Sequence, residues 1–231
     1  MARDHVFITD GLSQAARERA DLSDAEAACA RNVEPHAFAI DKAARAHIKA
    51  QRPCAVWFTG LPAAGKSTIV NLVDQRLTAS GAHTGVLDGD SLRHGLNRDL
   101  GFTDADRIEN IRRAGHVARL MAEAGLIVLC AFVSPFRFER RVTRGLMDVG
   151  EFIEVFVDTP IHVCMQRDPK GLYAKARDGR VSQVTGIDSP YEAPHDPDIH
   201  LVTTTASADV LADVVVCELT KRGIVRNDAF R

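Results

Sequence analysis

The stretch that decides the fold is Ala55-Val56-Trp57-Phe58-Thr59, followed directly by Gly60-Leu61-Pro62-Ala63-Ala64-Gly65-Lys66-Ser67-Thr68. A short, continuous apolar run that stops at a glycine is typical of a strand buried on both faces of a parallel sheet. The residues that follow fit the pattern G-x-x-x-x-G-K-[ST], and apolar residues then recur at helical spacing. A strand, a glycine-rich loop and a helix in this order predict a loop that binds phosphate groups.

Each residue type of the loop has a part in holding a triphosphate. Gly60 and Gly65 permit backbone conformations that a Cβ would obstruct, so the loop N–H groups can point inward at the β- and γ-phosphates. The following helix adds the positive end of its dipole. We expect Lys66 to reach the phosphate oxygens of ATP and Ser67 to offer its hydroxyl to Mg²⁺. The alternative interpretation is a glycine-punctuated turn beside an exposed lysine.

The rest of the main domain alternates between strand and helix patterns. Further short apolar runs lie at residues 84–87, 126–133, 152–157 and 199–203. Apolar residues at helical spacing lie at residues 67–79, 104–124, 138–147, 162–167 and 208–222. This alternation indicates βαβ units, whose right-handed crossovers place helices on both faces of a parallel sheet. The predicted fold class is therefore α/β, with three layers and a parallel central sheet.

Residues 1–50 differ in composition, being rich in alanine and in charged residues. Ser23-Asp24-Ala25-Glu26 has the form of a capping box, which predicts a first short helix. Pro35 interrupts the pattern, and a second helix is expected over residues 38–50. We therefore expect a helical N-terminal extension over residues 1–50 and the main domain over residues 51–231.

The composition limits the partners and the location that we expect. The 231 residues carry a formal net charge of only −2, which gives no case for nucleic acid or an acidic membrane surface as a partner. Any anion-binding site must therefore be built locally. The five cysteines are scattered without metal-ligand spacing, and we find neither a signal-peptide pattern nor an apolar run long enough to cross a bilayer. We expect a reduced, cytoplasmic protein.

Polar residues follow two of the predicted strands. Asp88 and Asp90 flank Gly89 after the second apolar run, and Ser134 follows the third. Ligand sites of parallel sheets lie beyond the carboxyl ends of the strands. A carboxylate there can orient or deprotonate an acceptor hydroxyl, and can touch the metal through water. The alternatives are an Asp-Gly turn capped by its own side chains and a serine that caps the next helix.

Two basic features suit an anionic ligand. Arg107 and Asn110 lie three residues apart in a predicted helix and therefore share a face. The basic segment 167–177, which includes Arg167 and Lys170, is punctuated by proline and glycine, as in a mobile lid that closes over a triphosphate. The alternatives are a solvated helix face and an exposed charged loop.

Six strings occur in order between about residues 50 and 204: WFTGLPAAGKST, LDGDSLRHGLNRDLGFTDADRIENIRR, FVSPFR, EVFVDTP, RDPKGLYAKAR and TGIDSPYEAP. Together they resemble the adenylyl-sulfate kinase family, also called APS kinases. The resemblance implies a nucleoside-kinase-like P-loop NTPase fold. It implies transfer of the γ-phosphoryl group of ATP to the 3′-hydroxyl of adenosine 5′-phosphosulfate (APS), giving PAPS and ADP. It also implies a homodimer, and functional coupling to ATP sulfurylase is a further expectation.

The resemblance carries roles over to individual residues. The expected catalytic residues are Lys66, Asp88, Asp90 and Ser134. Family descriptions assign Ser134 as a phosphoserine intermediate, although in-line transfer between two bound nucleotides needs no covalent step. The expected ATP-binding residues are the loop from Gly60 to Thr68 and Arg167, with Ser67 as the metal ligand. The expected APS-binding residues are Asp90, Arg93, Phe102, Arg107, Asn110, Val133, Ser134, Lys170 and Val184, with Phe102 stacked on the adenine.

The chain departs from the family pattern in three places. The family loop usually reads GLSGAGKS or GLSGSGKS, where this chain has Pro62 and Ala63. Proline removes one backbone donor and alanine forbids some glycine conformations, so we expect altered phosphate affinity. Val184 stands where the family often has a phenylalanine that completes an aromatic sandwich, and losing a stacked ring costs about 1 kcal/mol. Ser91 stands where the family usually has an asparagine.

Two alternative functions remain. The first is a P-loop kinase of the same fold that phosphorylates another small hydroxyl compound, which the matches at Arg93, Phe102, Arg107 and Asn110 disfavour. The second is a nucleotide-binding module that has lost turnover, which the intact Lys66, Ser67, Asp88 and Asp90 disfavour.

Overall fold

The computed structural model describes residue 36 and residues 38–225, and the described residues from Ile40 onward form one compact unit. The helix predicted from residue 23 lies outside the described residues. Helix α2 (Lys42–Lys49) lies within the second helix predicted for the extension, and the Asp41 side chain caps it by accepting from Ala44 N at 2.8 Å. The division of the chain at residue 50 stays a prediction.

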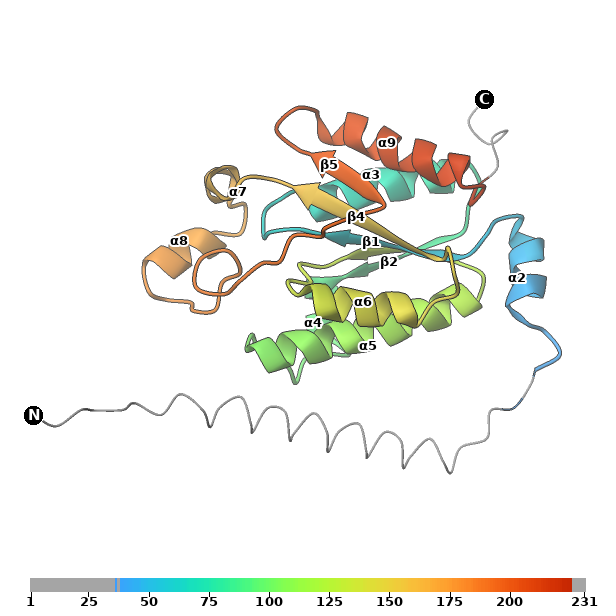
Figure 1. The fold of residues 1–231 in the computed structure, drawn as a ribbon, viewed down its shortest axis with the longest axis horizontal. Coiled ribbons are helices and arrows are strands. Elements are labelled where there is room, and N and C mark those ends of the chain that lie inside the picture. Colours follow the sequence, from blue (N-terminus) through green and yellow to red (C-terminus); the bar gives the residue numbers. More distant parts are fainter. Residues whose placement is uncertain (1–35, 37, 226–231) are drawn as a thin grey trace, which may run out of the picture. The chain divides into compact units, whose positions relative to one another are not determined.

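A parallel sheet with the order β2-β3-β1-β4-β5 forms the centre of the unit (Figure 1). The strands are β1 (Cys54–Thr59), β2 (Thr84–Asp88), β3 (Ile127–Ala131), β4 (Phe152–Asp158) and β5 (Ile199–Val202). All residues of β1 are buried, as the apolar run predicted. Phe58 lies opposite Ala131, the last residue of β3, and Thr59 lies opposite Phe156, so β3 ends where the glycine-rich loop begins and β4 continues to Asp158.

Helices cover both faces of the sheet, which confirms the three-layer α/β prediction. One face packs against α3 (Lys66–Ala79) and α9 (Ala208–Lys221), and the other against α5 (Asp104–Glu123) and α6 (Arg137–Gly145) (Figure 1). Side chains of β1 alternate between the two layers, as a strand requires. Cys54, Val56 and Phe58 join the core under α3 and α9, and Ala55 and Trp57 join the core under α5.

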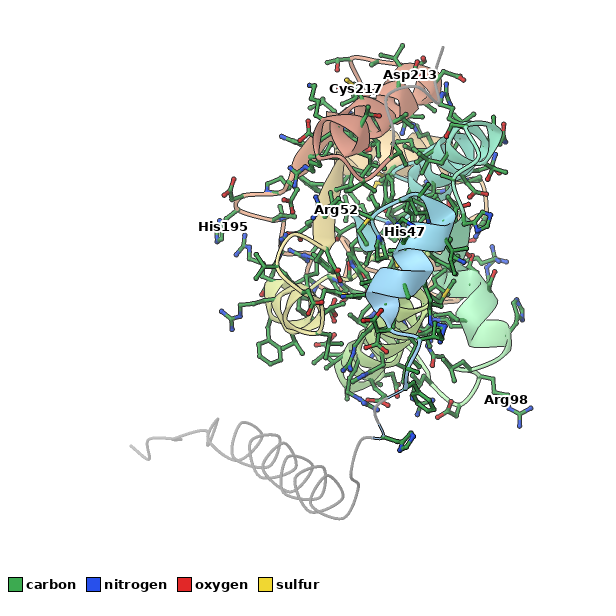
Figure 2. All side chains as sticks on the ribbon, turned by 90° about the vertical axis from the view of Figure 1, so that its right-hand side faces the viewer. His47, Arg52, Arg98, His195, Asp213 and Cys217 are labelled. Atoms are coloured by element: carbon green, nitrogen blue, oxygen red, sulfur yellow. The ribbon has the colours of Figure 1, made fainter. Side chains whose placement is uncertain are left out.

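Three short helices lie at the loop end of the sheet: α4 (Gly89–His94), α7 (Ile161–Arg167) and α8 (Leu172–Arg177). The sequence predicted α7, but neither α4 nor α8. Helix α8 lies within the segment that we expected to be a lid loop. Cys217 is exposed on α9 (Figure 2), whereas the other cysteines in the described part are buried. No helix among the described residues is long and apolar enough to cross a bilayer.

The N-terminus of α6 contains a buried carboxyl group. Glu139 Oε1 accepts from the Phe136 N–H at 3.1 Å, which satisfies one of the unpaired donors of the first turn. Glu139 is only 3 % exposed, and its Oε2 has no hydrogen-bond partner within the described residues. Burial raises the pKa of this carboxyl to about 8, so Glu139 is largely protonated at neutral pH.

We expect Glu139→Gln to stabilise the fold, and more strongly as the pH rises. Between the ordinary glutamate pKa of 4.5 and about 8, the unfolded chain loses a proton that the folded chain keeps, so stability falls with pH. Glutamine keeps the bond to Phe136 without this dependence. Thermal melts should give a gain of about 2–4 °C at pH 8 and almost none at pH 4. A gain that does not depend on pH would contradict the buried, protonated carboxyl.

Candidate active site

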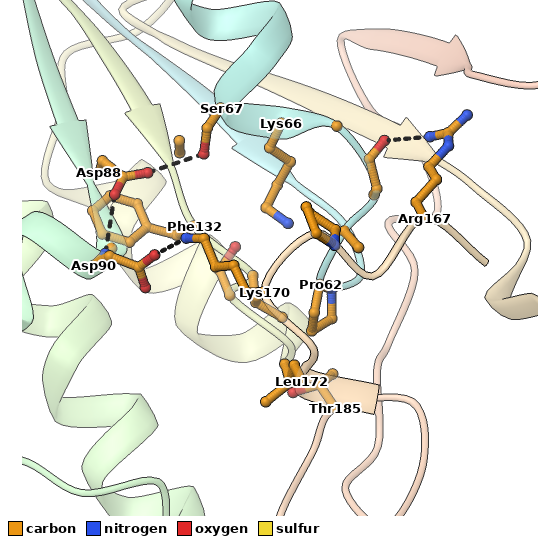
Figure 3. Close-up of a pocket in the computed structure, with 18 of the residues that line it drawn as sticks. Pro62, Lys66, Ser67, Asp88, Asp90, Phe132, Arg167, Lys170, Leu172 and Thr185 are labelled. Atoms are coloured by element: carbon orange, nitrogen blue, oxygen red, sulfur yellow. Dashed lines mark hydrogen bonds and ion pairs between the residues drawn. The ribbon is translucent and has the colours of Figure 1, made fainter. Parts of the chain in front are cut away.

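A cavity of about 790 Å³ lies at the loop end of the sheet (Figure 3). Its wall combines the glycine-rich loop, the ends of β2 and β3, the first turns of α5, and segments near residues 170, 184 and 206. Every residue that the sequence assigned to a site lines this cavity, except Gly60 and Leu61. Residues far apart in the chain therefore meet around one space.

The glycine-rich loop begins at Gly60, beside Val157 of β4. Gly60 has a φ of 151°, and a Cβ at this position would lie 2.5 Å from the carbonyl oxygen of Val157, so only glycine fits. Lys66 Nζ donates to Gly60 O at 2.9 Å and to Leu61 O at 2.8 Å. Gly60 and Leu61 thus contribute their carbonyls to the lysine. Burial lowers the pKa of Lys66 to about 8, against the opposing effects of Asp88 and other groups.

Pro62 and Ala63, which depart from the usual family loop, form the middle of one turn. Ala64 N donates to Leu61 O at 3.2 Å, and Ala63 adopts a left-handed φ of 59° between them. Proline at the second position and positive φ at the third describe a type II turn, in which proline is favoured and glycine is expected after it. Pro62 therefore fits the turn, and its carbonyl accepts from Tyr173 at 3.0 Å. The strain falls on Ala63.

Asp88 connects the loop to the opposite side of the cavity. Its Oδ1 accepts from Ser67 Oγ at 3.0 Å, and its Oδ2 accepts from Asp90 N at 3.1 Å and Ser91 N at 3.4 Å (Figure 3). Asp88 is thus the N-cap of α4 and a neighbour of the loop hydroxyl at the same time. The self-capped turn that the sequence offered as an alternative is therefore present, and Asp88 also lines the cavity, so the cap does not exclude a role toward a ligand.

The basic segment contacts both sides of the cavity. Lys170 forms an ion pair with Asp90, and this bond raises the pKa of Lys170 (Figure 3). Arg167 donates to Ala64 O at 3.2 Å and to Thr203 O at 3.2 Å, which ties the glycine-rich loop to the end of β5. The segment thus bridges the loop and the DGD turn.

The ring of Phe102 lies between two arginines in the wall of the cavity. The guanidinium carbon of Arg93 lies 4.4 Å from the ring centre of Phe102, and that of Arg107 lies 5.8 Å from it. Arg107 also donates to the carbonyls of Phe102, at 3.0 Å, and of Gln183. Burial lowers the pKa of both arginines, which marks them as partly desolvated cations. The ring itself stays 55 % exposed and lines the cavity.

Sequence reasoning missed one residue of this wall. Thr185 lies beside Val184, is only 1 % exposed, and its Oγ1 has no partner within the described part of the chain. The string TGID contains it, but nothing in the string distinguishes its hydroxyl from that of any other threonine. Asp188 accepts from Gln183 N at 2.6 Å and Val184 N at 2.5 Å, which fixes this stretch of backbone. Asn110 accepts from Asn97 at 3.0 Å.

Ser134 lies in the loop after β3 and takes a left-handed φ of 38°. The N-cap of α6 is Phe136, so the alternative that Ser134 caps the helix is wrong. Its Oγ accepts from Trp57 Nε1 at 3.1 Å. The neighbouring carbonyl of Val133 accepts from Thr59 Oγ1 at 2.8 Å, which holds the loop against the end of β1.

The cavity wall carries cationic groups from several elements. The loop contributes Lys66 and the N-terminus of α3, and Arg93, Arg107 and Lys170 come from the other parts of the wall. Within the described residues no cluster of three or more histidine, cysteine or carboxylate side chains would hold a metal ion. Ser67 and Asp88 offer two oxygens beside the loop, a donor set that suits a Mg²⁺ ion bound mainly by phosphate and water.

A family model and a curated relative both match this chain over most of its length. The model of the family described as adenylylsulphate kinase matches residues 52–202. The chain is 56 % identical over 194 residues to an adenylyl-sulfate kinase of Aeromonas hydrophila, which covers 84 % of this chain and 98 % of that protein.

Longer relatives and a solved structure match the same region. The bifunctional enzyme NodQ of Azospirillum brasilense is 60 % identical over 195 residues, which is 84 % of this chain but 32 % of that protein, so the chain spans about a third of it. A structure of the Mycobacterium tuberculosis APS kinase CysC in complex with AMPPNP and APS aligns with a TM-score of 0.71 at 50 % identity. The alignment covers 73 % of this chain and 98 % of that one.

We expect Ala63→Gly to increase the free energy of unfolding by about 0.5–1 kcal/mol, because glycine removes the left-handed strain. Ala64→Gly is the matched control, since Ala64 is buried and has no positive φ, and it should be destabilising. Urea unfolding of the two variants measures both effects. Equal losses of stability in the two variants would contradict a strained Ala63.

Proposed function

Because this chain belongs to the adenylylsulphate kinase family, we infer that it is an adenylyl-sulfate kinase that transfers the γ-phosphoryl group of ATP to the 3′-hydroxyl of APS, giving PAPS and ADP. One observation carries the inference for this chain itself. The phosphate loop and the DGD turn meet through the 3.0 Å hydrogen bond from Ser67 to Asp88, inside a single cavity. Donor and acceptor nucleotides can therefore be bound within reach of each other.

ATP would occupy the end of the cavity formed by the loop. The inward loop N–H groups and the α3 dipole would hold the β- and γ-phosphates, with Lys66 as the mobile cation. Arg167 and the residues near 206 line the space beyond, where the nucleoside would lie. Ser67 and Asp88 would hold Mg²⁺, which would supply charge neutralisation between the β- and γ-phosphates.

APS would occupy the end of the cavity formed by Phe102 and the arginines. The exposed ring of Phe102 offers a stacking surface for the adenine, backed by Arg93 and Arg107. Arg107, Asn110 and Lys170 would bind the anionic and polar groups, and Val133 and Ser134 would meet the sulfonucleotide from the end of β3. We add Thr185 to this set, because it lines the cavity beside Val184 and its buried hydroxyl has no partner within the described residues.

Asp90 is the residue that we propose receives the proton of the 3′-hydroxyl. It lies one glycine beyond Asp88, which holds Asp90 N in the first turn of α4. Its ion pair with Lys170 would place a cation beside the transferring group. A serine nucleophile needs a neighbouring base. The partner of Ser134 Oγ is an N–H donor, which supports direct transfer with Ser134 as a substrate contact.

We also propose a setting for this activity. The enzyme would act in the cytoplasm in sulfate assimilation, as a homodimer functionally coupled to ATP sulfurylase. Relatives named as bifunctional, which this chain matches over about a third of their length, support a link to a second activity.

The assay for the proposed function is ADP release that depends on added APS, measured beside a panel of other small hydroxyl compounds. Release with another acceptor alone would favour a different kinase of this fold. No release above background with any acceptor would favour a non-catalytic module. Magnesium chelation should abolish turnover with APS.

We expect Asp90→Asn to lower kcat at least about 100-fold while ATP binding is retained, because the amide cannot accept the hydroxyl proton. Asp99→Asn is the matched control, since Asp99 is an exposed aspartate paired with Arg113 outside the cavity. Steady-state kinetics and ATP titration separate the two effects. Full turnover by Asp90→Asn would exclude this carboxylate as the base.

We expect Val184→Phe to lower the KM for APS by about 3- to 10-fold with little change in kcat, because the new ring can stack on the adenine from the side opposite Phe102. The KM for ATP should not change. An unchanged or higher KM for APS would mean that the adenine does not lie between positions 102 and 184.

A further inference from the structure

Trp57, in the central strand, is fully buried between two other aromatic rings. Its ring centre lies 4.9 Å from that of Phe132 and 5.8 Å from that of Phe152, and both pairs are stacked. A phenylalanine would fill this part of the core without adding a polar group. The indole adds an N–H, which needs a partner when it is buried.

The partner of that N–H is the hydroxyl of Ser134, at 3.1 Å. An indole nitrogen is a donor only, so Ser134 Oγ must be the acceptor in this bond. The hydroxyl keeps its own proton. Within the described residues no acceptor is bonded to that proton, and Ser134 lines the cavity. The hydroxyl can therefore donate its proton to a ligand in the cavity.

The backbone on the other side of Ser134 is held by a buried cation. Arg140 donates to Ser134 O at 2.6 Å and to Glu154 Oε1 at 2.7 Å, and Thr59 Oγ1 lies 3.4 Å from the same carbonyl. With the peptide held and φ fixed in the left-handed region, the remaining freedom of Ser134 lies in its side-chain torsions. The bond from Trp57 restricts those torsions.

We propose that Trp57 is a positioning residue for APS: its N–H fixes Ser134 Oγ so that the serine hydroxyl donates to an anionic oxygen of the sulfonucleotide. Trp57 acts through Ser134, since its own side chain is buried and does not line the cavity. This inference rests on the proposed function and adds a specificity element to it. A correctly oriented hydroxyl donor at Ser134 favours a substrate that has an anionic oxygen within its reach.

The test uses the fact that Trp57 is the only tryptophan of the chain. Replacing tryptophan with β-(3-benzothienyl)alanine keeps the bicyclic shape and exchanges the N–H for sulfur at this one position. We expect the KM for APS to rise about 3- to 10-fold, with kcat and the KM for ATP almost unchanged. Trp57→Phe should give the same selective change, with an additional loss of stability from the smaller ring.

Two comparisons separate positioning from a structural effect. Phe152→Leu disturbs the same ring stack without touching the Trp57 to Ser134 bond, and should lower the melting temperature but leave the KM for APS unchanged. In a Ser134→Ala background, the benzothienyl substitution should have no further effect on that KM. An unchanged KM for APS in the benzothienyl protein would overturn the proposal. So would an equal rise of that KM when the benzothienyl residue is introduced into the Ser134→Ala variant. Absence of APS turnover in the unmodified protein would instead overturn the proposed function.

Discussion

The hydrogen bond from Ser67 to Asp88 depends on a constraint set by the whole sheet. Parallel strands end on the same side, so the loop after β1 and the turn after β2 can meet only if β3, which lies between them, ends at the same level. The close approach of Gly60 to the Val157 carbonyl then fixes where the loop leaves β1. A register shift of one residue in any of these strands would turn its side chains to the opposite face of the sheet.

Conformational strain in the described chain is concentrated around the cavity. Four non-glycine residues have positive φ, and three of them, Ala63, Ser134 and Gln183, line the cavity. Each is held by a partner that is remote in sequence: Tyr173 bonds beside Ala63, Arg140 holds Ser134, and Arg107 holds Gln183. Strained backbone persists where the surroundings determine it, and here it shapes the surface that ligands meet.

The sequence predicted the strands and the long helices well because their signals are local. The apolar run before Gly60 and the helical spacing over residues 104–124 each lie within one element, and the structure differs from them by a residue or two at the ends. Helices α4 and α8 were missed for other reasons: α4 starts at the glycine of an Asp-Gly pair and contains one apolar residue, and α8 lies in a basic segment next to Pro169 and Gly171. The phosphate loop and the two aspartates of the DGD turn were also predicted from local motifs.

What the sequence could not provide was the pairing of distant side chains. The alternative role of Ser134 as a cap failed because the chain continues to Phe136 before α6 begins. Thr185 was missed because its lack of a hydrogen-bond partner depends on groups elsewhere in the fold. Pro62 and Ala63 looked unfavourable by residue type, yet Pro62 suits its turn and only Ala63 is strained.

The contact between Lys170 and Asp90 has a consequence for how ligands enter. Both side chains remain well exposed, at 74 % and 63 %, so water already solvates them and the pair contributes little to global stability. Breaking such a bridge costs little free energy, so it would let the segment move away from Asp90 while the buried strands beneath keep their pairing. Dissolved ions screen such exposed charges, so ionic strength would govern access to the cavity rather than the integrity of the fold.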